Sequence, residues 1–320
     1  MIKELSFVRL SALAKEWLLQ GGLPRVELAA MEPTLWQEGS HTFQDVISLF
    51  ADMGYQVNIT TNGSTLDQYA EDLAKLPIGK IRISWHTLDP QAYKKMTGGD
   101  YEIFLKGIHS CVEHGLPVCY NRVLFKGLTE DIARHIEIID LQKARIKFLE
   151  LYVTKHNSPF FGKYHLNSEE FLRMANQHPL LKRDETFLPN HAARSRHVWI
   201  TPKGGRVEFK IAETCTKTVV CQSCPFSADC IEGFAEYFRV LPDGRAALCY
   251  LRNDFDVQLF KNDLPIFFET KRLLEIAGID FDRWVKHRSL RLILTSRCNY
   301  NCTLPEGEAT FCLGKRFRSM

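Results

Sequence analysis

The sequence lacks any apolar run of the roughly 18 to 20 residues that a membrane-spanning helix needs. Its first residues, MIKELSFVRLSALAKEW, also lack the uninterrupted apolar core of a signal peptide, because Arg9, Lys15 and Glu16 break it. We therefore expect a soluble globular protein of the cytoplasm that has no membrane partner.

A strong excess of one charge is absent too. The formal net charge is only +3 over 320 residues, which is too small to indicate nucleic acid binding. Basic residues could still gather in a cleft around an anionic substrate.

Internal repeats and low-complexity segments are also missing. With 45% hydrophobic residues, the chain is long enough for one large domain, or for one domain and a smaller one.

Cysteine, by contrast, is abundant, with ten residues in a chain expected to work where thiols stay reduced. Clustered cysteines in such a protein more often hold metal than form disulfides. The clustered ones form two groups: Cys215, Cys221, Cys224, Cys230 and Cys249, and then Cys298, Cys302 and Cys312. The isolated Cys111 and Cys119 lie in apolar patterns, so we expect both to be small core residues.

Short β-branched runs alternate with amphipathic segments through the first half of the chain. The pattern predicts helices over 6–20, 42–54, 64–76, 101–115 and 129–142. It predicts strands over 25–31, 56–61, 80–86, 117–125 and 146–152. Strands separated by single helices indicate βαβ units and therefore a parallel sheet or barrel.

The first predicted helix has no strand before it. The apolar run LRLILTS, residues 290–296, supplies the missing strand near the other end of the chain. We therefore predict an α/β fold, an open six-stranded (β/α) partial barrel that is circularly permuted, since domain termini commonly lie close together. The alternative is a five-stranded barrel, with residues 290–296 belonging to the second domain.

Residues 153–287 differ in character and indicate a small α+β, cysteine-rich second domain. Two hairpins are predicted there, with turns at Lys203-Gly204-Gly205 and Pro242-Asp243-Gly244. The predicted domains are thus residues 1–152 for five barrel strands, 153–287 for the second domain, and 288–320 for the first barrel strand and its cysteine loop.

Polar residues follow the predicted strands at their C-terminal ends, where parallel barrels carry their active sites. Each of them alone is more often a cap or turn residue, but their joint placement indicates a functional rim. They are Glu32, Thr60 to Gly63, Ser84, His86, Asn121 and Glu150.

Five segments in this order, VELAAMEPTL, NITTNGSTL, ISWHTLDPQAYKKMTG, NRVLFKGLTED and FLELY, resemble the radical S-adenosylmethionine (SAM) superfamily, in particular its molybdenum-cofactor, GTP 3',8-cyclase-like branch. The resemblance implies an enzyme in which a 4Fe-4S cluster cleaves SAM reductively to a 5'-deoxyadenosyl radical. That radical abstracts hydrogen from a substrate. It also implies a reducing partner such as flavodoxin or ferredoxin.

The same resemblance suggests ligands for that cluster. Cys298 and Cys302 match the first two positions of the family's CxxxCxxC motif, the third is Pro305, and Cys312 is the nearest candidate for the third sulfur. The family's Gly-Gly-Glu-Pro appears as residues 30–33, so Glu32 is expected to hold the SAM amino group.

Four further residues match positions that lie near the cofactor in the family. The resemblance places Thr61 and Asn62 near SAM and substrate, and Ser84 and Asn121 near the SAM carboxylate or ribose.

The other cysteine group suggests a second metal site. Cys221, Cys224, Cys230 and Cys249 could surround either zinc or a 4Fe-4S cluster, since four thiolates suit both. The residues alone favour zinc, whereas the resemblance favours an auxiliary 4Fe-4S cluster; Cys215 is a possible substitute ligand.

The substrate stays open at this point among a nucleotide, another small molecule and a peptide. The alternative from another functional class is a non-catalytic, metal-stabilised binding protein that kept this fold. Pro305 in the third-ligand position and the side chains of Ala30 and Met31 favour that alternative, while Glu32 and the TTNG turn favour the enzyme.

Overall fold

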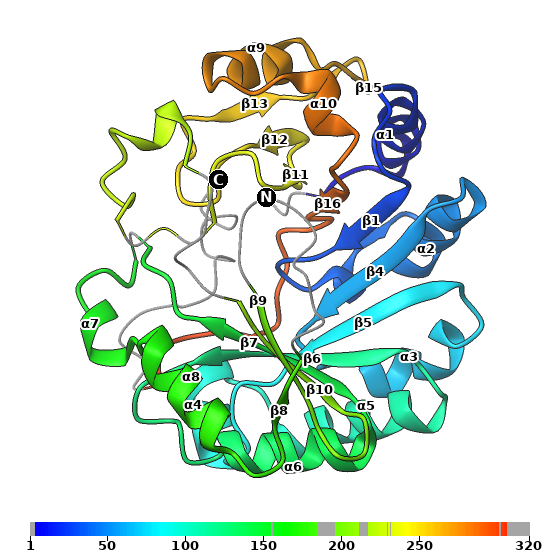
Figure 1. The fold of residues 1–320 in the computed structure, drawn as a ribbon. Helices are drawn as coiled ribbons and strands as arrows, with labels where there is room; N and C mark the ends of the chain where they lie inside the picture. Colours follow the sequence, from blue (N-terminus) through cyan, green and yellow to red (C-terminus); the bar gives the residue numbers. More distant parts are fainter. Residues whose placement is uncertain are drawn as a thin grey trace.

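The computed structural model of the chain describes residues 4–154, 156–184, 196–210, 217–228, 230, 232–300 and 302–305. Within these residues one large sheet of twelve strands runs in the order β13-β12-β11-β16-β1-β4-β5-β6-β7-β10-β9-β8. In Figure 1 this sheet curves around the centre of the view, and most helices lie on its outer side. The fold is the α/β class that the alternation of segments predicts.

Eight consecutive strands in the middle of the sheet are parallel to one another. In sheet order they are β11 (Phe238–Val240), β16 (Leu290–Leu292), β1 (Arg25–Leu28), β4 (Gln56–Thr61), β5 (Ile78–Ser84), β6 (Val118–Leu124), β7 (Arg145–Glu150) and β10 (Arg206–Lys210). Antiparallel strands extend both edges: β12 (Arg245–Ala247) and β13 (Asp256–Gln258) on one side, β9 (Arg196–Ile200) and β8 (Lys182–Arg183) on the other.

The strand encoded near the end of the chain lies beside the first strand, as predicted. β16 pairs with β1 in parallel, with Leu290 opposite Val26 and Leu292 opposite Leu28. The next segment then runs antiparallel to the start of the chain, because the Leu5 N–H donates to the Leu294 carbonyl at 2.8 Å. This neighbour relationship is confirmed, and the circular permutation that explains it stays a prediction.

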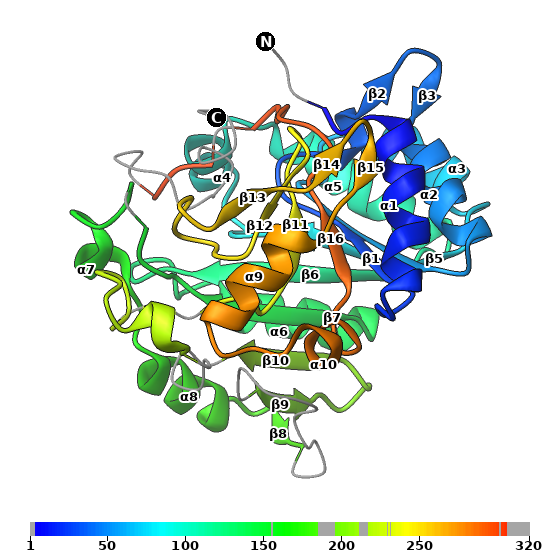
Figure 2. The same cartoon turned by 90° about the horizontal axis from the view of Figure 1, so that it is seen from above.

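Helices between the parallel strands cover the outer face of the sheet (Figures 1 and 2). They are α1 (Phe7–Leu19), α2 (Phe43–Asp52), α3 (Leu66–Leu73), α5 (Tyr101–Glu113) and α6 (Ile132–Gln142); a further helix, α4 (Pro90–Thr97), packs against α5 and the segment after Cys302. The second of these begins with a capping box in which Thr42 and Asp45 satisfy each other's backbone N–H groups, so that start is confirmed. α4 is not among the helices predicted from the sequence.

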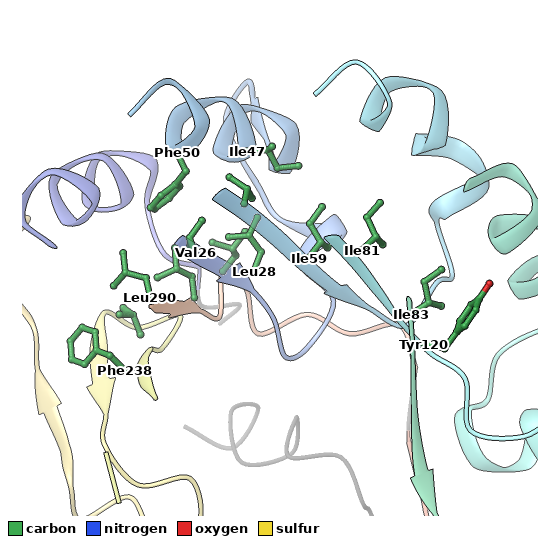
Figure 3. Packing of buried hydrophobic residues seen from close by; sticks show 14 of the residues in the cluster. Val26, Leu28, Ile47, Phe50, Ile59, Ile81, Ile83, Tyr120, Phe238 and Leu290 are labelled. Carbon is green, nitrogen blue, oxygen red and sulfur yellow. The ribbon is translucent and has the colours of Figure 1, made fainter. Parts of the chain in front are cut away.

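The core lies between the sheet and these helices (Figure 3). Val26 and Leu28 of β1, Ile59 of β4 and Ile47 and Phe50 of α2 are all buried there. Full burial of each such side chain contributes about 1.5–3 kcal/mol, so this layer fixes which face of each strand points outward. Cys111 and Cys119 are also buried, which confirms their prediction as core residues.

Both predicted hairpins form, but they continue the barrel sheet. β10 pairs with β7 and β11 pairs with β16, so the sheet has more strands than the six predicted. The physical reason is that the open edges of a partial barrel expose unpaired N–H and C=O groups, which the hairpins satisfy. The predicted domain boundaries at residues 152 and 287 stay a prediction.

The remaining elements are short. They are β2 (Gln37–Glu38), β3 (His41–Thr42), β14 (Phe260–Lys261), β15 (Leu264–Pro265), the 3-10 turns η1 (Pro33–Leu35) and η3 (Val219–Cys221), and the helices α7 (Phe161–Tyr164), α8 (Ser168–Gln177), α9 (Phe268–Ile276) and α10 (Phe281–Val285). Across the part of the chain that the structure describes, no helix combines the length and apolarity that crossing a membrane requires.

Candidate functional site

Three strand ends meet at one rim of the sheet. β16, β1 and β4 are consecutive neighbours and parallel, so the segments that follow them emerge on the same side. Those segments carry Cys298, Glu32 and the turn Thr61-Asn62-Gly63. Cys298, Glu32 and this turn therefore lie at the same side of the sheet, whereas their function stays a prediction.

The Glu32 side chain is completely buried and held by hydrogen bonds from two segments. Its Oε1 accepts from the Thr34 hydroxyl at 2.8 Å, the Thr61 hydroxyl at 2.8 Å and the Thr34 N–H at 3.3 Å. Its Oε2 accepts from the Asn62 N–H at 2.7 Å. One carboxylate thus joins the segment after β1 to the turn after β4.

Burial and hydrogen bonding act on this carboxyl in opposite directions. Complete burial raises the pKa of Glu32 above its ordinary value, and the hydrogen bonds from Asn62, Thr34 and Thr61 oppose that rise. A carboxylate in such a place favours a cationic partner, because a nearby positive charge stabilises its ionised form.

The two residues before Glu32 adopt backbone conformations that suit glycine. Ala30 has φ of 67° and Met31 has φ of 55°, both in the left-handed region. This conformation costs a residue with a side chain about 1–2 kcal/mol. The backbone at Ala30 and Met31 thus adopts a conformation typical of glycine, although both residues carry side chains. Glu32 still lies at the rim.

The cysteine loop contacts the same turn. The Asn62 side-chain amide donates to Asn299 Oδ1 at 2.9 Å, and it lies 3.9 Å from Cys298 Sγ. The Glu32 N–H donates to the Arg297 carbonyl at 3.1 Å. The partly buried Cys298 thiol therefore lies beside the Asn62 side-chain amide. Cys298 directly follows Arg297, whose carbonyl accepts from the Glu32 N–H.

Ser84 and Asn121 lie farther along the same rim. They are opposite each other on β5 and β6, and the following Trp85 N–H donates to the Asn121 carbonyl at 2.8 Å. Among the contacts of the described residues, none joins either side chain to Glu32 or Cys298. Their role at a cofactor stays a prediction.

The cysteines of the second group lie around η3 and β12. The Cys224 N–H donates to the Cys221 carbonyl at 3.1 Å, while Cys249 follows β12. Within the described residues, no three Cys, His, Asp or Glu side chains are close enough together to hold a metal ion. The four-sulfur site of Cys221, Cys224, Cys230 and Cys249 therefore stays a prediction, and Cys215 and Cys312 lie outside the described residues.

Charged side chains gather on one face of the central strands. Glu27 of β1 forms an ion pair with Arg82 of β5 and accepts from the Thr60 hydroxyl at 2.6 Å. Burial alone raises the pKa of Glu27, but Arg82, Arg291 and the Thr60 hydrogen bond outweigh it and hold that pKa below its ordinary value. Glu27 is thereby kept ionised.

Further basic side chains share this face, and Glu208, which pairs with Arg145, offsets part of their charge. Burial lowers the pKa of Lys80, and the neighbouring Arg145 and Arg82 lower it further. On β11 the buried Arg239 pairs with Glu232 at 2.9 Å, and its guanidinium lies 4.1 Å from the centre of the Tyr250 ring. The face is therefore suited to an anionic group.

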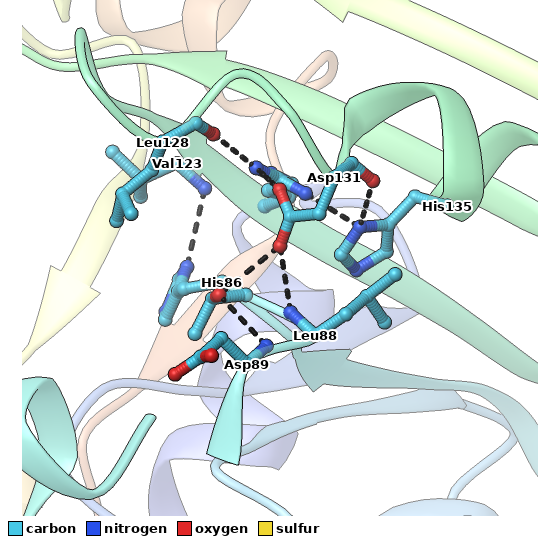
Figure 4. Close-up of polar contacts among 9 residues, drawn as sticks. His86, Leu88, Asp89, Val123, Leu128, Asp131 and His135 are labelled. Carbon is cyan, nitrogen blue, oxygen red and sulfur yellow. Dashed lines mark hydrogen bonds and ion pairs between the residues drawn. The ribbon is translucent and has the colours of Figure 1, made fainter. Parts of the chain in front are cut away.

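A partly buried ion pair that the sequence did not reveal lies beside this rim (Figure 4). Arg122 of β6 pairs with Asp131, which also accepts from the Thr87 hydroxyl at 3.0 Å and the Leu88 N–H at 2.7 Å. Because Asp131 contacts residues more than forty positions away in the chain, only the fold could reveal this link.

His86 and Glu150, two of the predicted rim residues, each contact a neighbouring segment of the chain. His86 is buried, and its Nδ1 accepts from the Val123 N–H at 3.2 Å; burial lowers its pKa to about 3, with Arg122 adding to the effect. Glu150 accepts from the Ser168 hydroxyl at 2.9 Å and contacts His165 Nε2 at 2.8 Å. Both residues tie a strand end to the segment beside it.

Comparison with known proteins adds independent findings. Residues 2–139 match a family model described as the Radical SAM superfamily. A probable GTP 3',8-cyclase of Thermococcus kodakarensis is 26% identical over 255 residues, which cover 78% of this chain and 74% of that protein.

Two solved structures complete the comparison. The structure titled native anSMEcpe with bound AdoMet has a TM-score of 0.48 at 14% identity and covers 88% of this chain and 73% of that one. A structure of TYW1 with a lysine-pyruvate adduct has a TM-score of 0.39 at 19% identity, over 50% of this chain and 52% of that one. The chain thus spans about half of the latter protein.

Proposed function

Since this chain belongs to the radical SAM superfamily, we propose that it cleaves S-adenosylmethionine reductively and abstracts hydrogen from a substrate with the resulting 5'-deoxyadenosyl radical. The observation that carries the proposal is the joint placement of Glu32, Asn62 and Cys298 at one rim. Cys298 and Cys302 would hold a cluster there, and its chemistry would be to supply the electron for cleavage of the bond between the SAM sulfur and C5'.

The donor set at the rim fits part of a 4Fe-4S site. Cys298 and Cys302 are two partly buried thiols on one loop, and thiolates are the ligands such a cluster requires. We assign Cys312 as the third ligand, because two sulfurs alone would leave two irons without protein ligands. The residue at the family's third position, Pro305, has no donor.

Glu32 is suited to hold the SAM amino group. Its Oε1 accepts three hydrogen bonds, whereas Oε2 accepts one from the described residues and keeps acceptor capacity. An ammonium group that donates to Oε2 would also offset the free-energy cost of burying the ionised carboxylate. Thr61 and Asn62 would then orient the carboxylate, and Ser84 and Asn121 would contact the remainder of SAM.

We further propose an auxiliary 4Fe-4S cluster at Cys221, Cys224, Cys230 and Cys249. Its support is the spacing of these cysteines and the hairpin of β11 and β12, which ends just before Cys249. Zinc is the alternative metal for the same four thiolates. Iron and zinc analysis of anaerobically purified protein distinguishes the two.

The substrate that we propose carries an anionic group. The support is the group of basic side chains on this strand face, Lys80, Arg82 and Arg291, whose charge Glu27 offsets in part. The relatives' name points to a nucleotide, but β11 carries a single arginine, Arg239, which already pairs with Glu232. The electron donor would be a flavodoxin or ferredoxin in the cytoplasm, where thiols stay reduced.

The decisive test is anaerobic reconstitution with iron and sulfide, followed by reduction and an assay for 5'-deoxyadenosine and methionine. The proposal predicts formation of both products that depends on SAM and reductant. A fully reconstituted protein that forms neither would support a metal-stabilised binding protein instead.

A further inference from the structure

The loop between Cys298 and Cys302 rests on α4, the helix that the sequence did not predict. Tyr300 lies midway between the two cysteines and is only 7% exposed. The Tyr93 hydroxyl of α4 donates to the Tyr300 hydroxyl at 3.2 Å, and the two rings meet edge to face with centroids 6.1 Å apart. An aromatic side chain therefore anchors the centre of the cysteine loop.

Gly99, just beyond α4, leaves the space that the Tyr300 ring fills. A Cβ at this position would lie 2.4 Å from Tyr300 Cζ and 2.7 Å from its hydroxyl oxygen. Gly98 next to it has nothing within 4 Å, and its φ is +73°. The first glycine thus makes room for Tyr300, while the second only allows a left-handed helix end.

The other side of Cys302 is bound to the same helix. The Thr303 N–H donates to the Met96 carbonyl at 2.7 Å, and the Thr303 hydroxyl donates to the same carbonyl at 3.3 Å. Leu304 packs in a buried cluster with Met96. Contacts before and after Cys302 therefore hold it against the last turn of α4.

The Arg122–Asp131 pair fixes where α4 begins. Asp131 binds the Thr87 hydroxyl and the Leu88 N–H, and the Thr87 hydroxyl accepts from the Asp89 N–H at 3.1 Å (Figure 4). Asp89 is the N-cap of α4 and accepts from the Ala92 N–H at 2.6 Å. A continuous set of contacts thus runs from Asp131 through α4 to Tyr300.

We propose that Tyr300, seated on Tyr93 and Gly99, is a positioning residue that sets the placement of Cys298 and Cys302 before any cluster binds. The inference rests on the proposed function only in taking these two cysteines as cluster ligands. Its consequence is that disturbing this seat exposes both thiols and lowers iron uptake at the rim, with little effect on the rest of the fold.

Two adjacent glycines provide a matched test in the full-length, metal-free protein under anaerobic conditions. Iodoacetamide labelling is followed by peptide mass spectrometry, with Cys249 as the reference in the same sample. Gly99→Ala should speed labelling of Cys298 and Cys302 about tenfold, because the new Cβ displaces the Tyr300 ring. Gly98→Ala should lower Tm by a few degrees through left-handed strain and leave both labelling rates within about twofold of the parent.

A second pair of variants keeps the test informative if Gly99→Ala does not fold. Tyr93→Phe keeps the ring and removes one hydrogen bond, so labelling should rise about 2- to 10-fold. Tyr300→Leu added to Gly99→Ala removes the clashing ring, so the double variant should recover the Tm lost by Gly99→Ala while its thiols stay reactive.

Equal labelling in the parent, Gly99→Ala and Tyr93→Phe would overturn the inference, as would equal increases in Gly98→Ala and Gly99→Ala. Labelling needs no SAM chemistry, so the two proposals fail separately. A parent that never forms 5'-deoxyadenosine but shows the expected labelling pattern defeats the proposed function and keeps this one.

Discussion

The rim around Glu32 and the cysteine group from Cys221 to Cys249 differ in how the protein holds them. At the rim, hydrogen bonds from Thr34, Thr61 and Asn62 fix the carboxylate. Around the cysteine group, no three candidate ligands lie together among the described residues. Protein hydrogen bonds thus orient the rim carboxylate, and we propose that the geometry of the second site depends on its metal.

The largest effect expected at the rim follows from loss of the third sulfur. Cys312→Ala should abolish both the cluster at Cys298 and Cys302 and SAM cleavage, and it should leave iron at Cys221, Cys224, Cys230 and Cys249, because one defined open iron requires three thiolates. Iron content per chain and 5'-deoxyadenosine formation measure the two effects. The control variant Cys111→Ala, which removes a buried core thiol, should leave the iron content at the parent value. A Cys312→Ala protein that is as active as the parent would show that the assignment of Cys312 as a ligand is wrong.

Removal of the Glu32 charge should have the next largest effect. Glu32→Gln should weaken SAM binding by about 10- to 150-fold, the equivalent of about 1.5–3 kcal/mol for a charged hydrogen bond. Equilibrium titration of the reconstituted protein with SAM gives the ratio of dissociation constants. The exposed Glu71→Gln on α3 serves as the matched control and should leave the dissociation constant unchanged. Identical constants for parent and Glu32→Gln would remove Glu32 from the SAM site.

Metal removal should separate the two regions directly. Chelation should speed amide hydrogen exchange across residues 217–228 about tenfold or more, because a metal bound by Cys221 and Cys224 would hold this segment in place. The Asn62 and Ser64 amides, which donate to Glu32 Oε2 and Asn62 Oδ1, should change by less than about twofold. If chelation changes the exchange rates equally at residues 217–228 and at Asn62 and Ser64, the distinction between a preorganised and a metal-dependent site is wrong.

The smallest expected effect concerns the backbone before Glu32. Ala30→Gly should stabilise the fold by about 0.5–1 kcal/mol, because glycine relieves the left-handed strain at this position. Chemical denaturation measures the change. Ala29→Gly, one residue earlier at a buried alanine without positive φ, should destabilise by about 1 kcal/mol. If both variants shift stability in the same direction, strain at Ala30 is not the cause.

Much of the fold could be predicted because its signals are local. Thr42 and Asp45 mark the start of α2, and the apolar run at Leu290 predicts a strand whose neighbour is β1. α4 could have been found in the same way, since Asp89 and Pro90 mark its start and Gly98 its end. The pairing of both hairpins with the barrel edges had no such signal, because backbone groups at a sheet edge accept almost any strand.

The site was predictable only where it depends on strand ends. Glu32, Asn62 and Cys298 meet because β1, β4 and β16 are adjacent and parallel. The seat of Tyr300 on α4 depends on side chains about 200 positions apart, and no sequence periodicity reports such contacts. The placement of Asp131 between two loops was beyond prediction for the same reason.

The most direct test of the preorganised rim is electron paramagnetic resonance of the reconstituted, reduced protein before and after SAM is added. Binding at an open iron beside Glu32 predicts that SAM shifts the signal of one cluster in the parent and that Glu32→Gln needs about 10- to 150-fold more SAM for the same shift. A cluster spectrum that saturating SAM leaves unchanged in the parent would contradict the account.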